Sequence, residues 1–68
     1  MKLTEIEQAR KNTLKVVRAA VRLRHAIYAD NELNKRLFDA EKAFDKAVAR
    51  GVMPNPLSIL DAIGEDHA

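Results

Sequence analysis

Apolar residues recur every three or four positions along the amino-terminal part of the chain, which is the spacing of an amphipathic α-helix. Neither glycine nor proline occurs between Thr4 and Ala29. Thr4 is a typical residue to precede a helix, and Glu7 three positions later completes the pattern of a capping box. We therefore predict a first helix over about residues 5–29.

The same spacing resumes after Asp30 and Asn31, two residues that interrupt one helix and favour the start of the next. It continues to Arg50, and the residue that follows, Gly51, is of the type that most often closes a helix. These signals predict a second helix over about residues 31–50.

A third, shorter helix is predicted near the carboxyl end. Two prolines hold the segment around them extended, and Asn55 followed by Pro56 is a typical helix start. We expect this helix to span about residues 56–63 and to be followed by a polar tail, 64–68. Its apolar side comprises Leu57, Leu60 and Ile63.

Together the three elements predict an all-α fold in which residues 1–68 form one small helical domain. The turn between the two long helices is short, so they should form an antiparallel hairpin. Because the second helix is shorter than the first, it leaves the first turns of the first helix uncovered. We expect the third helix to fold back there, so that Leu57 and Leu60 meet Leu3 and Ile6.

The apolar surface of the first helix is wider than one neighbouring helix covers. One stripe forms a seam of heptad-like spacing that comprises Ile6, Ala9, Thr13, Val16, Ala20, Leu23 and Ile27. A second apolar stripe lies beside this seam, and the two stripes together form a wide apolar arc. Within this arc lies Arg24, whose guanidinium needs a partner. We therefore predict a homo-oligomer, most simply a dimer. Its interface is expected to comprise Leu14, Val21 and Tyr28 of the second stripe, together with Phe38 and Arg24.

Another edge of the first helix carries cations at alternating spacings of four and three residues, namely Lys11, Lys15, Arg18, Arg22 and His25. No acidic residue interrupts the segment between Gln8 and Ala29. Neighbouring like charges destabilise a helix by about 0.2–0.5 kcal/mol per pair, so a compensating negative surface is expected. An external polyanion or an acidic patch on a partner protein would supply it. So would acids of the same chain, of which the second helix holds Asp39, Glu41 and Asp45.

Composition narrows the class of protein. The chain has 68 residues, a net charge of +2 and no cysteine, so neither a disulfide nor a thiolate zinc site is expected. It has no apolar run long enough to cross a membrane and no apolar signal-peptide core, so we expect a cytoplasmic protein that does not enter a membrane. Ser58 is the only serine, and the two histidines are far apart in sequence. We expect no catalytic site, no metal and no cofactor.

The plan of helix, Asp30 and helix, with acidic residues after Gly64, resembles the Rop family of plasmid RNA-binding regulators over about residues 4–50. That resemblance implies a dimeric four-helix bundle that binds RNA hairpins with its first helices. The sequence departs from that family where two prolines interrupt the end of the second helix, at 54–56.

The hairpin, with Ala43, Ala47 and the ending Ala49-Arg50-Gly51, also resembles the hairpin domain of phage proteins that sequester cyclic oligonucleotides. Its second helix is about a turn short for that family. Both resemblances concern architecture alone, and they assign no functional residue.

These features predict a non-enzymatic binding protein that holds a phosphate-rich ligand on the five basic positions of the first helix. Nucleic acid is the first candidate ligand and a nucleotide signal is the second. No aromatic residue is interleaved with the cations, so contacts would be mainly to phosphates. The alternative is a phage- or plasmid-type interaction module that inhibits or regulates a host protein through an apolar helix face. Phe38 and the second apolar stripe motivate that alternative.

Overall fold

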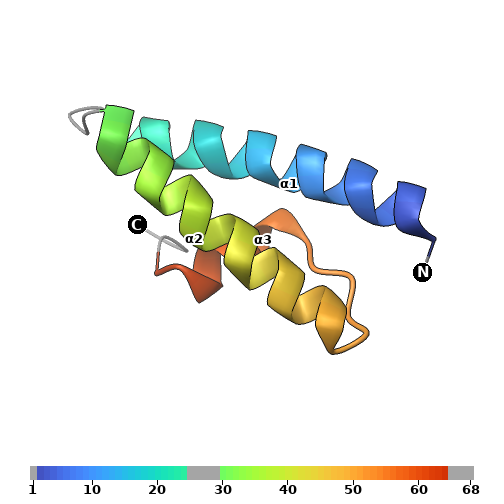
Figure 1. Cartoon of the computed structure of the whole chain (residues 1–68). Coiled ribbons are helices and arrows are strands. Elements are labelled where there is room, and N and C mark those ends of the chain that lie inside the picture. Colours follow the sequence, from blue (N-terminus) through green and yellow to red (C-terminus); the bar gives the residue numbers. More distant parts are fainter. Residues whose placement is uncertain (1, 25–29, 65–68) are drawn as a thin grey trace.

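A computed structural model describes residues 2–24 and 30–64 of the chain, and the regular elements within these ranges are three helices. Helix α1 spans Leu3–Arg24, α2 spans Asp30–Ala49 and α3 spans Pro56–Ala62. The two long helices run in opposite directions (Figure 1). The prediction of an all-helical chain with two long helices and one short one is therefore confirmed over the described ranges, which contain no strand.

The start of α1 differs slightly from the predicted one. The helix begins at Leu3, and its first turn is closed by a hydrogen bond of 3.0 Å from the Ile6 N–H to the Lys2 carbonyl. Thr4 thus lies inside the first turn instead of preceding it, so the predicted capping role of Thr4 was wrong. The predicted last turn of this helix, residues 25–29, lies outside the described residues.

Helix α2 ends as the sequence predicts, at a glycine. Gly51 has a φ of +82°, in the left-handed region that glycine adopts without steric cost. Its N–H donates to the Val48 carbonyl at 2.9 Å, and the Val52 N–H donates to the Ala47 carbonyl at 3.0 Å. This pair of bonds is a Schellman motif, which satisfies the last carbonyls of the helix and turns the chain away from it.

Helix α3 also begins as predicted, with Asn55 as its N-cap and Pro56 as its first residue. The Ser58 N–H donates to the Asn55 side-chain oxygen at 2.9 Å, and the Asn55 N–H donates to the Ser58 hydroxyl oxygen at 3.2 Å. This reciprocal pairing satisfies two N–H groups that a helix start otherwise leaves without partners. A seven-residue helix, too short to be stable alone, is thereby defined at its beginning.

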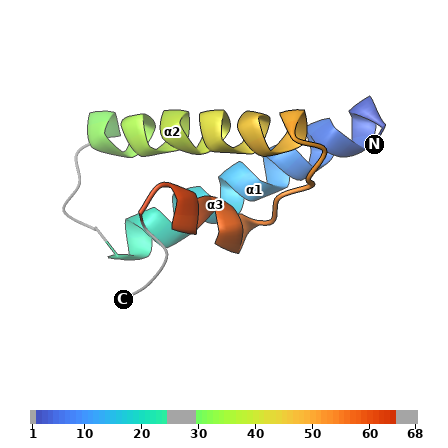
Figure 2. The same ribbon diagram turned by 90° about the horizontal axis from the view of Figure 1, so that it is seen from below.

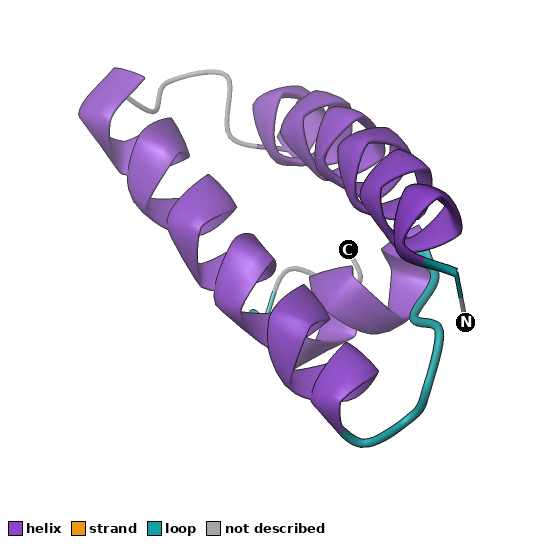
Figure 3. Ribbon diagram, turned by 45° about the vertical axis from the view of Figure 1, so that its right-hand side comes forward, coloured by secondary structure: helices purple, strands orange, loops and turns teal. Residues whose placement is uncertain are grey.

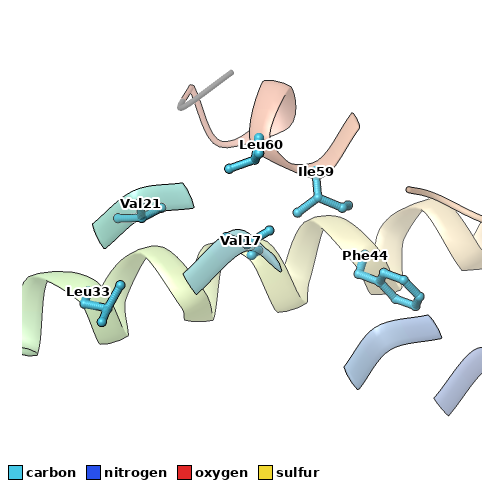
Figure 4. Packing of buried hydrophobic residues seen from close by; sticks show 7 residues of the cluster. Val17, Val21, Leu33, Phe44, Ile59 and Leu60 are labelled. Atoms are coloured by element: carbon cyan, nitrogen blue, oxygen red, sulfur yellow. The ribbon is translucent and has the colours of Figure 1, made fainter. Parts of the chain in front are cut away.

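The core is a single cluster to which all three helices contribute (Figure 4). Figure 4 shows Ile59 and Leu60 pointing from α3 toward side chains of both long helices. Since α3 packs against α1 and α2 alike, it closes one side of the hairpin and completes the core. The buried residues of the helices are Thr13, Val17 and Val21 of α1, Leu33, Ala40 and Phe44 of α2, and Ile59 and Leu60 of α3.

The position of α3 along α1 corrects a prediction. Leu60 belongs to the same core cluster as Val17 and Val21, whereas Leu3 and Leu57 are both exposed, so the expected contact between α3 and the first turns of α1 was wrong. Figures 2 and 3 show the reason, because the segment after α2 turns back along the hairpin and carries α3 toward its other end. An extended chain advances about 3.3 Å per residue, so these few residues are enough for that displacement.

The buried sector of α1 also differs from the predicted seam. Val21, assigned to an uncovered second stripe, is completely buried, whereas Val16 and Leu23 of the expected seam are 46% and 85% exposed. Helices α2 and α3 together enclose the sector centred on Val17. Val16 lies one position and therefore about 100° away around the helix, outside that enclosure.

Candidate functional site

The middle of the basic stripe lies on an exposed face of α1. Lys11, Lys15 and Arg18 are all exposed, because the four-residue repeat that ends in Val17 and Val21 turns the opposite side of α1 into the core. The three cations extend over seven residues, or about 10 Å at ~1.5 Å per residue. None of the three forms an ion pair with another described residue.

These three cations line one groove between α1 and α2, which we call the α1 groove. Its volume is about 370 Å³, and its lining comprises Lys11, Leu14, Lys15, Arg18, Leu37 and Glu41. Leu14 of α1 and Leu37 of α2 are half-buried and pack against the core, so α1, which carries the cations, is held beside α2. Half of the lining residues are therefore cationic, and one is acidic.

The acid of the α1 groove already has a partner. Arg10 lies between two carboxylates of α2, with its Nη2 atom 3.4 Å from Glu41 Oε2 and 3.2 Å from Asp45 Oδ2. Its Nε atom is buried and has no hydrogen-bond partner among the described residues. The sequence offered these acids as one of three possible partners of the basic stripe, and the structure pairs them with Arg10 instead. Exposed pairs of this kind contribute about 0–1 kcal/mol each.

The carboxyl-terminal part of the predicted stripe is arranged differently. Arg22 forms an ion pair of 3.6 Å with Asp30, across the junction of the two long helices. The side chains of Arg22 and Asp30 are 60% and 93% exposed, so water and salt screen this pair and Arg22 can leave it at little cost. His25 lies outside the described residues. The structure therefore brings three of the five predicted residues into one groove and places Arg22 in an ion pair.

The residues predicted at an oligomer interface do not share one surface. Val21 is buried by its own chain and offers no area to a second copy, while Leu14 lines the α1 groove. Arg24 is exposed and is the last residue of α1. Phe38 is 55% exposed and has the Lys42 ammonium 4.5 Å from its ring centre. Tyr28 lies outside the described residues.

A second group of cations was missed by the sequence reasoning. Lys42 and Lys46 of α2 and Arg50 directly after it follow one another at four-residue intervals and line a larger groove of about 660 Å³ against α3. The sequence contains this spacing, but Glu41 and Asp45 directly precede the two lysines. The segment therefore resembles an ordinary solvent-exposed helix surface with charges of both signs. In the structure Glu41 and Asp45 pair with Arg10 of α1, and this pairing separates the acids from the lysines of α2.

The chemistry available to the α1 groove is electrostatic. No group of three or more potential metal ligands occurs in the part of the chain that the structure describes. No helix in that same part is long and apolar enough to cross a membrane. No protein-family model, curated protein or solved structure matches this chain, so its function is argued from its own residues.

Proposed function

We propose that the chain is a non-enzymatic binding protein whose α1 groove holds a phosphate-rich ligand, with nucleic acid as the first candidate and a phosphorylated nucleotide as the second. The observation that carries this proposal is the convergence of Lys11, Lys15 and Arg18 on one groove. None of these cations is paired with another described residue, and the acid of the groove is held by Arg10.

The spacing of the cations suits a phosphate backbone. Phosphates of one duplex strand follow one another at about 3.4 Å along the axis, so ~10 Å of helix corresponds to about three phosphates. Lysines act as mobile point charges toward phosphate, and Arg18 can donate two parallel hydrogen bonds to it. Arg22 would extend the contact by one more position if its weak pair with Asp30 opened.

Recognition in this site would depend on charge and shape. The α1 groove contains aliphatic and charged side chains and, among its lining residues, no aromatic ring on which a base would stack. Asn12 is the amide nearest the cations, and its side-chain oxygen accepts a hydrogen bond of 3.2 Å from the Gln8 amide. Contacts to phosphate position a ligand without reading its sequence, so we expect little preference among base sequences.

The test is a titration with a fluorescent RNA hairpin and a DNA duplex, each at two salt concentrations. Lys15→Glu/Arg18→Glu should weaken binding at low salt by about 100-fold, because it replaces two attractions by two repulsions. Lys2→Glu/Lys35→Glu is the matched control, since it changes net charge equally at exposed residues outside the groove. Wild-type protein without salt-sensitive affinity for either nucleic acid or for a nucleoside triphosphate would refute the proposal.

A second candidate function is a phage- or plasmid-type module that docks an apolar helix face onto a host protein. Two exposed side chains of α1, Val16 and Leu23, favour it because they lie seven residues apart on one side of the helix. The same side of α1 would form the interface of a homodimer, which is the assembly that we propose. Light scattering distinguishes the homodimer from the host-protein module. If the chain is a dimer and Leu23→Glu dissociates it, a second copy covers this side of α1. If the chain is a monomer, this side remains available to a host protein.

A further inference from the structure

The groove between α2 and α3, which we call the α2–α3 groove, is the larger of the two basic grooves and has a different lining. It is lined on the α2 side by Lys42, Lys46 and Arg50, and Asp39 is the one acid among its described lining residues. Its floor is aliphatic and comprises Ala43, Ala47, Val52, Pro54, Ile59 and Ile63. Pro54 and Ile59 are buried, so this floor is continuous with the core.

The charge of the α2–α3 groove is one-sided. Lys42, Lys46 and Arg50 lie one helical turn apart and extend over about 12 Å. None of them forms an ion pair with another described residue, and Lys42 is positioned over the Phe38 ring. Among the residues that the structure describes, the α3 side of the groove contributes Ser58 and Ala62 to the rim and no charged side chain.

We propose that this groove binds an acidic amphipathic helix of a partner protein, apolar side down, with its carboxylates along the α2 side. A helix repeats its side chains at three and four residues, so a row of acids beside an apolar stripe would match the row of cations beside the floor. A single fatty carboxylate would use one cation of three. A nucleic acid would leave the aliphatic floor without apolar contacts, and the floor offers no aromatic ring for stacking.

This site is independent of the α1 groove. Leu37 and Glu41 line one flank of α2 and Lys42 and Lys46 line the other, because five positions correspond to about 140° around a helix. The small residues Ala43 and Ala47 leave room between α2 and α3 for a bulky side chain of the ligand to descend toward Ile59. The volume of about 660 Å³ falls in the range of sites that enclose a few side chains or one small ligand.

The experiment uses two labelled peptides of about 18 residues, long enough to form isolated helices. Both carry leucines at three- and four-residue spacing, and one flank of the leucine stripe holds glutamates in the first peptide and lysines in the second. Fluorescence anisotropy with the full chain should detect binding of the glutamate peptide, and affinity for the lysine peptide should be at least about tenfold weaker.

Three variants locate the peptide. Lys46→Glu should weaken glutamate-peptide binding by about tenfold or more, whereas Lys35→Glu, an equal charge change on an exposed residue of α2 outside the groove, should change it by less than about twofold. Ala62→Trp fills the rim without altering charge and should also weaken binding by about tenfold. All three positions are exposed, and circular dichroism should show unchanged helix content.

Several outcomes of these experiments would contradict the proposed peptide site. Equal binding of the two peptides, or equal effects of Lys46→Glu and Lys35→Glu, would overturn the proposal. So would direct binding of an oligonucleotide or of dodecanoate that is at least as tight as binding of the glutamate peptide and is lost on Lys46→Glu, since either result would assign the groove to that ligand. The Lys15→Glu/Arg18→Glu variant should retain peptide binding, so failure of the proposed α1 function leaves this test intact.

Discussion

The α1 groove and the α2–α3 groove each hold three cations at helical spacing, and they differ in what lies beside the cations. The α1 groove is the smaller, with two leucines and a carboxylate among its lining residues. The α2–α3 groove has a broad aliphatic floor that continues into the core. A row of cations attracts anions in general, and the surface next to the row selects the class of anion.

A substitution in the core should have the largest effect, because it destabilises the fold that forms both grooves. Phe44→Ala should destabilise the fold by about 3–5 kcal/mol, because Phe44 is completely buried on the α2 face between the two grooves. That is a large share of the ~5–15 kcal/mol typical of a whole domain, so both ligands should be lost. Urea unfolding followed by circular dichroism measures the change in the free energy of unfolding.

Phe38→Ala is the matched control for this prediction, since Phe38 lies on the same helix but is half exposed. Its loss should cost about 1 kcal/mol or less, from its contact with the Lys42 ammonium. If Phe44→Ala abolished binding of only one ligand in a folded protein, the two grooves would not share a common support.

The second prediction separates the grooves by salt. Raising salt from about 50 to 200 mM should weaken nucleic-acid binding by about 20- to 40-fold if three phosphates are neutralised. Peptide binding in the α2–α3 groove should weaken only several-fold, because apolar contacts with the floor are insensitive to salt at these concentrations. Titrations of both ligands in the same buffers provide the measurement. Equal salt dependence would mean that the floor contributes nothing to the peptide's affinity.

The third prediction concerns the turn that precedes α3. Gly51→Ala should destabilise the fold by about 1–2 kcal/mol, because Gly51 has a φ of +82° that an L side chain adopts with strain. No atom lies within 4 Å of the added Cβ position, so the cost is one of backbone conformation alone. For a domain of this size, each kcal/mol lowers the melting temperature by about 4–8 °C.

Gly51→Asn is the control for this change, and it should cost less because asparagine tolerates the left-handed conformation. In the folded protein, Gly51→Ala should affect peptide binding more than nucleic-acid binding, since Val52 and Pro54 just after the turn line only the α2–α3 groove. Equal melting temperatures of the alanine and asparagine variants would contradict a backbone origin of the effect.

The local signals in the sequence were sufficient for the end of α2 and the start of α3. Gly51, Asn55 and Pro56 act through bonds within a few residues, and such bonds are independent of how the helices pack. The packing itself was not predictable, because Val16 and Val21 are both apolar and both lie on a wide apolar arc. Which of them is buried depends on where α3 docks, and that depends on the path of an extended segment that carries no periodic pattern.

The two groups of cations differ in the same respect, since the sequence predicted one group and not the other. Lys11, Lys15 and Arg18 were predicted together because one helix fixes their spacing. The cations of the α2–α3 groove have a spacing just as regular, but their meaning depends on Ile59, which comes from another element. A groove between two helices requires knowledge of both, so composition and periodicity alone did not indicate it.

The smallest expected effect tests the one acid in the α1 groove. Glu41→Gln should raise affinity for nucleic acid by about two- to threefold, because it removes a carboxylate that repels phosphate from the groove. Arg10 would keep Asp45 as a partner at 3.2 Å, so the fold should be unaffected. Asp45→Asn removes the same unit of charge from the Arg10 cluster, but Asp45 does not line the groove. Its effect should therefore be smaller, and equal gains would show that net charge, not the groove, governs binding.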